Sequence, residues 1–334
     1  MQYTPIIRAD PTCLLAVARS VPRPELAPLF VFDNEDLDQL AVRAARLRFS
    51  DHTVAVDIRS ERRGELLRRF DSALAPLLAA GARCRPVISI DDDPAALREL
   101  GARTTSRGSQ VTLRLRIPAV GARERLQQAM VLASAATRIP RQNIHILLDQ
   151  ADDTSTVACA QLVPLLAANG PWASIAVAAG SMPAMAANAR RGEWIRADRH
   201  EVRIAAVLDA LGDVGTPLGF ADYTNRHPLL EATLTHARGN GLRWPDGESW
   251  HILRETGVTG WPSGESRRSH LEVLAEMGVV NADRPRSWGE RSLSRFIGGQ
   301  GESDQINAWM MNHHIELSSV AAGRQSTTTA AAAS

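Results

Sequence analysis

The sequence of 334 residues contains no lysine, so its basic residues are all arginine. This absence excludes Schiff-base formation and lysine general-base catalysis, because both need an ε-amino group. Arginine keeps its charge and presents a planar fork of donors. Cationic sites in this protein are therefore suited to carboxylate or phosphate groups.

Cysteine is scarce, and long apolar runs are missing. Cys13, Cys84 and Cys159 lie far apart and form no CxxC or Cys/His metal spacing, so we expect free thiols in a reducing compartment. No run approaches the roughly 20 apolar residues of a membrane span, and the N-terminal residues lack the pattern of a secretory signal. We therefore expect a cytoplasmic protein with no membrane partner.

Charge of either sign is not in excess. The chain has 38 basic and 37 acidic residues and a net charge of +1. No broad electrostatic field should then attract nucleic acid or anionic lipid, and a nucleic-acid role would need a local patch.

What the sequence does contain is a repeated alternation of β-rich runs and helical periods, which is typical of βα units around a parallel sheet. Eight runs are predicted as strands: 3–8, 27–33, 53–59, 85–91, 110–117, 143–149, 172–179 and 217–222. Helices are predicted between them, for example over 36–48 and 64–80. Eight strands favour a closed (β/α)8 barrel, like the TIM barrel, over an open sheet.

The first βα turn argues against the rival open fold. It reads Arg-Ala-Asp-Pro-Thr-Cys from Arg8, without the glycines that a dinucleotide pyrophosphate requires. We assign the barrel to 1–228, a C-terminal extension packed on it to 229–322, and a disordered tail to 323–334. The later part of the chain is rich in tryptophan, namely Trp244, Trp250, Trp261, Trp288 and Trp309.

Polar residues follow the predicted strands, where the active sites of barrels form. Five aspartates lie at strand ends, namely Asp33, Asp57, Asp91, Asp149 and Asp222, and Arg8 and Arg59 occupy equivalent places. On the fifth strand Arg114 and Arg116 share one face, because side chains alternate with period two. If that face points inward, two cations lie opposite the aspartates.

Two interpretations of this set stay open. Asp57, Asp149 and Asp222 could hold a divalent metal ion that activates water, with Arg114 binding the phosphate of a phosphoester or nucleotide. Alternatively, the aspartates cap helices or pair with arginines that fill the barrel mouth.

Further candidates are Ser181 and His227. Ser181 lies in Gly-Ser-Met-Pro, where Pro183 breaks the GxSxG pattern, so a ligand-contacting or capping serine is a better interpretation than a nucleophile. His227 follows the last strand and could reach the barrel mouth, or could be an ordinary loop histidine. The adjacent His313 and His314 point to different sides of a helix or strand, which favours structural or partner-contacting roles.

Several of these segments together resemble the beta-protein family of phages and satellite phages. The resemblance rests on Tyr-Thr-Pro-Ile-Ile-Arg at 3–8, Ala-Pro-Leu-Phe-Val at 27–31, Leu-Arg-Leu at 113–115, Leu-Leu-Asp at 147–149, Gly-Ser-Met-Pro at 180–183, Phe-Ala-Asp-Tyr-Thr-Asn-Arg-His-Pro at 220–228 and Asn-His-His-Ile at 312–315. Ala221 stands where the family usually has glycine. The resemblance covers nearly the whole chain.

The resemblance implies a cytoplasmic barrel carried by phages and mobile elements, acting in antiphage defence or toxin immunity. On this hypothesis the barrel mouth binds a small ligand or a partner protein encoded by a neighbouring gene, and tryptophans of the extension anchor the interface. The expected binding residues are Arg8, Arg114, Arg116, Ser181, Tyr223 and His227. The alternative is a metal-dependent hydrolase of a phosphoester or nucleotide.

Overall fold

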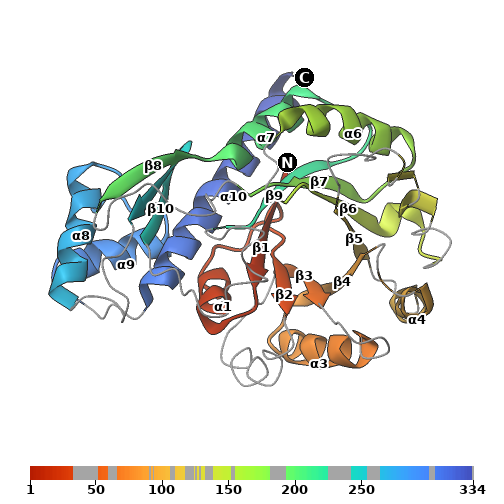
Figure 1. Ribbon diagram of the computed structural model, residues 1–334, viewed down its shortest axis with the longest axis horizontal. Helices are drawn as coiled ribbons and strands as arrows, with labels where there is room; N and C mark the ends of the chain where they lie inside the picture. Colours follow the sequence, from red (N-terminus) through yellow and green to blue (C-terminus); the bar gives the residue numbers. More distant parts are fainter. Residues whose placement is uncertain are drawn as a thin grey trace.

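The protein is described by a computed structural model (Figure 1). The structure describes residues 1–32, 52–58, 66–89, 92, 94–105, 110–116, 124, 126–127, 129–131, 138–151, 155–180, 193–224, 242–253, 264–300 and 305–332.

Eight parallel strands close into a barrel in the order β1-β2-β3-β4-β5-β6-β7-β9, and β1 pairs with both β2 and β9. The strands are β1 (Gln2–Arg8), β2 (Leu29–Phe32), β3 (Thr53–Ile58), β4 (Arg83–Ser89), β5 (Val111–Arg116), β6 (Ile144–Asp149), β7 (Ser174–Ala178) and β9 (Leu218–Asp222). Each of the eight predicted runs overlaps one of them, with β1 beginning one residue and β4 two residues before the predicted run. The predicted (β/α)8 barrel is confirmed.

Helices surround this barrel (Figure 1). They include α1 (Pro11–Ala18), α3 (Leu66–Ala79), α4 (Pro94–Thr105), α6 (Thr156–Ala168) and α7 (His200–Ala210), with a short 3-10 turn, η1 (Arg141–Asn143), before β6. The helix predicted over 64–80 corresponds to α3. The helix predicted over 36–48 lies outside the described residues.

The period of two along each strand separates two cores. Inward side chains, such as Ile6, Ala55, Leu147 and Ala176, form a cluster inside the barrel. Residues of the opposite parity, such as Val56, belong to the larger cluster in which strands and helices pack. At the end of a strand, only the side chains that share the inward face can therefore reach the barrel mouth.

The first turn is stabilised at the start of α1. The side chain of Asp10 accepts a hydrogen bond from the Cys13 N–H at 2.9 Å, and Pro11 occupies the first helical position. Both features are typical of a helix N-terminus. The turn after β1, where a dinucleotide-binding fold would have a glycine-rich loop, is therefore the capped start of α1.

A second unit lies beside the barrel (Figure 1). The strands β8 (Trp194–Asp198), β10 (Leu242–Asp246) and β11 (Ser249–Leu253) form an antiparallel sheet in the order β10-β11-β8, accompanied by α8 (Gly264–Glu276), α9 (Trp288–Ile297) and α10 (Ile306–Ala332). Sequence analysis did not predict β8, which lies between barrel strands β7 and β9 in the chain. The extension therefore takes one strand from within 1–228 and two from after it.

The tryptophans of the extension mostly form its core. Trp244 and Trp250 are fully buried and Trp309 is 6% exposed, whereas Trp288 is half-buried. Trp261 lies outside the described residues. The expectation that exposed tryptophans anchor a partner is wrong for the three buried rings, because the antiparallel sheet and α10 enclose them.

Helix α10 joins the two units. It packs on α9 and β10 on one side and on α1 and β1 on the other (Figure 1). It continues to Ala332 and so includes most of 323–334, the segment for which we expected a disordered tail. Alanine has the highest helix propensity, and extending a packed helix is easier than nucleating one. No helix in the described part of the chain is long and apolar enough to cross a membrane.

The close contact between α9 and α10 depends on Gly289. A Cβ atom at this position would overlap the backbone carbonyl oxygen of Trp309. We predict that Gly289→Ala lowers the free energy of unfolding by about 1–3 kcal/mol, the usual cost of overpacking, measured by urea denaturation. The control is Gly323→Ala in α10, where no atom lies within 4 Å of the added Cβ. Equal stability of the two variants would contradict the prediction.

Candidate functional site

The barrel mouth is organised around the side chain of Arg114, which points inward from β5. Its Nε donates a hydrogen bond to Asp149 at 2.9 Å, and its Nη1 forms an ion pair with Asp57. Its Nη2 donates to the Tyr223 hydroxyl oxygen at 2.8 Å. The face of β5 that carries Arg114 points inward, a direction that the sequence left open, and the structure brings Arg114, Asp57, Asp149 and Tyr223 together.

Asp149 is the most enclosed member of this mouth cluster and is fully buried. Its carboxylate accepts hydrogen bonds from the Tyr223 hydroxyl at 2.7 Å and the Ala151 N–H at 2.9 Å. Burial alone would raise the pKa of Asp149, but Arg114 and these donors together hold the pKa below its usual 3.8. Burial, and then the negative charge of Asp149, raise the pKa of Tyr223. At neutral pH the cluster therefore contains an ionised carboxylate and a neutral phenol.

Two further arginines extend the cluster towards solvent. Arg116 shares the inward face of β5, its Nε lies 3.8 Å from Asp149, and its side chain is 53% exposed. Arg8 ends β1 on the same face as Ile6 and is half-buried. Among the described inward residues at these strand ends, three arginines accompany two aspartates. Arg8 and Arg116 thus bring positive charge to this part of the mouth.

Asp222 does not belong to the mouth cluster. On β9, Ala221 and the following Tyr223 point into the barrel, so Asp222 between them points outward. It accepts hydrogen bonds from the Tyr3 hydroxyl at 3.1 Å and the Thr224 N–H at 2.8 Å. The placement of Asp222 with Asp57 and Asp149 was wrong, because its strand position has the opposite parity.

Outside the barrel, Asp222 faces His314 of α10. His314 Nε2 lies 2.9 Å from Asp222 Oδ2, and its Nδ1 lies 3.4 Å from Arg199. An arginine can only donate, so Nδ1 accepts and the Nε2–H donates to Asp222. Burial would raise the pKa of Asp222, but His314, Arg199 and the Thr224 N–H hold it below 3.8. The contact is a buried hydrogen bond that connects β9 of the barrel to α10.

Arg199 and Glu201 complete this outer cluster. The Arg199 Nε donates to Glu201 at 2.7 Å and its Nη2 donates to Ser318 at 2.9 Å. The Arg199 guanidinium also lies over the Trp250 ring, 5.4 Å from its centre. Sequence analysis missed both residues. Arg-His-Glu at 199–201 gives no pattern that distinguishes it from an exposed helix start.

The predicted metal set does not fit these positions. Asp222 faces away from the mouth, and Arg114 lies between Asp57 and Asp149 as their shared cation. A different trio, Glu201, Asp222 and His314, has ligand atoms within 4.8 Å of one another. There the Arg199 guanidinium already supplies the positive charge. We therefore derive no metal chemistry from either cluster.

The remaining candidates divide into two groups. Ser181, His227, Asp33, Arg59 and Asp91 lie outside the described residues. His313 and His314 are both described, and their rings do lie on different sides: His313 stacks on Trp244 and His314 on Trp250, with ring centres 4.3 and 4.8 Å apart. Both histidines are fully buried in the fold.

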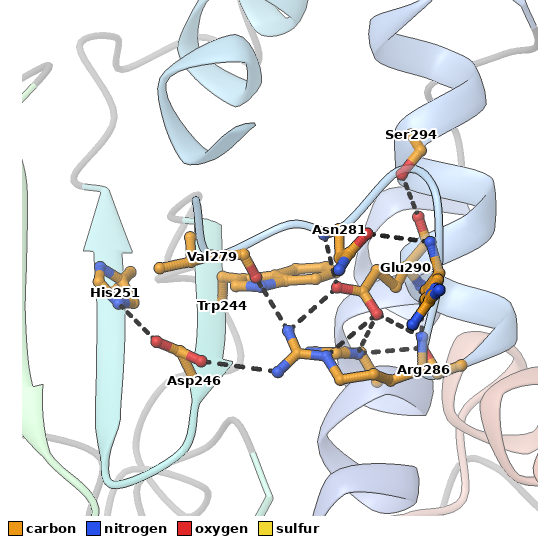
Figure 2. A network of polar contacts seen from close by, with 11 residues as sticks. Trp244, Asp246, His251, Val279, Asn281, Arg286, Glu290 and Ser294 are labelled. Carbon is orange, nitrogen blue, oxygen red and sulfur yellow. Dashed lines mark hydrogen bonds and ion pairs between the residues drawn. The ribbon is translucent and has the colours of Figure 1, made fainter. Parts of the chain in front are cut away.

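The polar side of the extension centres on Glu290 (Figure 2). Arg286 donates to both oxygens of Glu290 and to the Val279 carbonyl, and its Nη1 lies 3.7 Å from Asp246. The Asn281 N–H also donates to Glu290, at 2.9 Å. These contacts fix the chain between α8 and α9.

A closed (β/α)8 barrel with a charged cluster at its mouth and an α+β extension clamped by the last helix defines the class of this protein. The chain belongs to the Beta protein family, whose model matches residues 13–318. Curated proteins give no match. Among solved structures, the chain is similar to an AP endonuclease of family 2 from Brucella melitensis, with 16% identity, a TM-score of 0.38, and coverage of 70% of this chain and 97% of that one.

The pairing of Asp149 with Arg114 leads to a prediction about stability and pH. We expect Asp149→Asn to lower the free energy of unfolding at pH 7 by about 3 kcal/mol, because the change removes a buried ionic partner. The folded pKa of Asp149 is below 3.8, so its contribution is complete above that pH and is lost as pH falls through the folded pKa. The difference between wild type and variant should shrink in acid, as measured by urea denaturation between pH 7 and pH 3.

The matched control for this experiment is Asp209→Asn, on the exposed side of α7. This variant should behave like the wild type at every pH. A difference between wild type and Asp149→Asn that stays constant down to pH 3 would show that the charge of Asp149 contributes nothing.

His314 generates a second prediction. His314→Gln should lower the free energy of unfolding by about 1–3 kcal/mol, because the stacked ring would leave Trp250 and a flexible amide would replace the imidazole as the donor to Asp222. The control is His200→Gln at the half-buried start of α7. Thermal unfolding of both variants checks the comparison, and an unchanged melting temperature for His314→Gln would contradict it.

Proposed function

We propose that this Beta family barrel is a binding protein whose mouth recognises an anionic group. The observation that supports this most is the exposed guanidinium of Arg116 beside the buried Arg114–Asp149–Tyr223 network. The network fixes the shape of the site, and Arg116 with Arg8 supplies charge that a carboxylate or phosphate can contact. Recognition of a ligand requires side chains that the surrounding structure holds in a fixed geometry.

The protonation states also favour binding over acid–base chemistry. A general acid or base works best with a pKa near the working pH. The pKa of Asp149 is shifted down and that of Tyr223 is shifted up, so neither group exchanges protons near pH 7. The alternative of a metal-dependent hydrolase through Asp57, Asp149 and Asp222 loses its third ligand, because Asp222 faces α10.

For the biological role, we propose an antiphage-defence or toxin-immunity component that acts by holding a ligand or partner protein at this mouth. Membership of the Beta protein family supports this proposal, since that resemblance implies phages and mobile elements as carriers. A partner would then present an acidic side chain to Arg116. The natural source of such a partner is the neighbouring gene.

Thermal unfolding with inorganic phosphate, citrate and a nucleotide panel tests the anion site. A ligand present at 100 times its Kd should stabilise the wild type by about 2.7 kcal/mol. Arg116→Gln should bind about tenfold more weakly, since it loses a charge-assisted hydrogen bond. Arg203→Gln, which removes an exposed pair with Asp198, is the control and should bind like the wild type.

Co-expression with the neighbouring gene product tests the partner. We expect a stoichiometric complex that Arg116→Glu disrupts through charge reversal. If no anion shifts the melting temperature and the protein is recovered alone, the proposed function is wrong.

A further inference from the structure

A cavity of about 350 Å³ opens on the sheet of the extension, and none of its lining residues belongs to the barrel-mouth cluster. Strands β8, β10 and β11 and the turn after α8 line it, including Trp194, Arg196, Asp246, His251 and Met277. Its volume lies within the range of small-molecule sites.

The sheet register places charges of opposite sign on one face of this cavity. Arg196 of β8 lies directly opposite His251 of β11, which lies opposite Trp244 of β10. Asp246 follows Trp244 by two residues and so takes the same face. Ser249, which accepts a hydrogen bond from the Arg196 side chain, lies opposite Asp246, so the Arg196 guanidinium reaches over β11 towards the strand that carries Asp246.

The positive end is held by one hydrogen bond. The Arg196 Nε donates to Ser249 Oγ at 2.7 Å. Within the described residues its terminal N–H groups have no protein acceptor, and the residue is exposed. The guanidinium is therefore oriented and able to take a carboxylate in the forked geometry that arginine prefers.

The negative end is a pair of acceptors with a gap between them. Asp246 is held by Arg286, and its side chain is 38% exposed. Its Oδ2 lies 4.0 Å from His251 Nε2, too far for a hydrogen bond but close enough for one donor to contact both (Figure 2). Burial, and also Arg196, lower the pKa of His251 against the pull of Asp246, so the ring is neutral at pH 7 and has one nitrogen that accepts.

An apolar wall completes the cavity. The Trp194 ring is fixed by a hydrogen bond from its Nε1 to the His270 carbonyl at 3.2 Å. Met277 is 47% exposed at the rim, and Val279 is buried behind it. A medium-sized apolar group would cover this wall and remove Met277 from water.

We propose that this cavity binds a free α-amino acid. Its carboxylate pairs with Arg196, its ammonium group donates to Asp246 and His251, and an apolar side chain packs on Trp194 and Met277. The ammonium and carboxylate groups of a zwitterion share one α-carbon, which suits opposite charges held on one face of a small sheet. Neither an anion alone nor a cation alone contacts both ends of the site.

Isothermal titration of the wild type with L-methionine, L-leucine and L-phenylalanine tests this proposal. At least one should bind, and its N-acetyl and amino-alcohol analogues, which lack the ammonium and the carboxylate, should bind at least tenfold more weakly. Arg196→Gln and Asp246→Asn should each weaken binding at least tenfold. Arg203→Gln is the matched control on the surface and should bind normally.

Circular dichroism establishes that each variant is folded, which is expected because Arg196 is exposed and the Asp246 side chain is half-buried at the surface. Absence of binding by all three amino acids, or equal binding by Arg196→Gln, overturns the proposal. Arg116→Gln at the barrel mouth should leave amino-acid binding unchanged. A failure of amino-acid binding therefore leaves the proposed anion site at the barrel mouth untouched. A failure of anion binding at the mouth likewise leaves the amino-acid site untouched.

Discussion

The buried contact between Asp222 and His314 holds this structure together, because it joins three distant parts of the chain. Asp222 ends the last barrel strand, His314 lies in the middle of α10, and Tyr3 of the first strand donates to the same carboxylate. A buried carboxylate is tolerated only when its lone pairs are filled, and here the phenol, the imidazole and the Thr224 N–H fill them. The Asp222 side chain thus contributes both to closure of the barrel and to docking of α10.

Much of the fold could be predicted because the signals are local. All eight barrel strands follow from runs of β-rich residues, and period two correctly placed Arg114 and Arg116 on one face of β5, although it could not say that this face points inward. Asp222 was misplaced although the same rule applies to it: Tyr223 points inward, so its neighbour must point outward. The prediction took a position at the end of a strand as sufficient for a side chain to reach the barrel mouth. Whether the side chain points inward or outward depends instead on its place in the alternation along the strand.

Other features could not be predicted, since they arise from contacts between distant residues. Strand β8 has the short mixed sequence Trp-Ile-Arg-Ala-Asp and becomes a strand by pairing with β11, about fifty residues later. The roles of Arg199 and Glu201 depend on His314, which is 115 residues from Arg199. The tryptophans of the extension were expected at a surface, but the packing of α10 encloses three of them.

The route of the chain through the extension has a consequence for synthesis on the ribosome. Tyr3 emerges first, but Asp222 is made 219 residues later and His314 a further 92 residues after that. Strand β8 likewise lacks its described pairing partner, β11, until that strand has been synthesised. The nascent barrel therefore carries an uncovered apolar face on β1 and α1 until the final helix leaves the exit tunnel. A chain arrested before α10 should be a client for chaperones and proteases, because this apolar face then stays exposed.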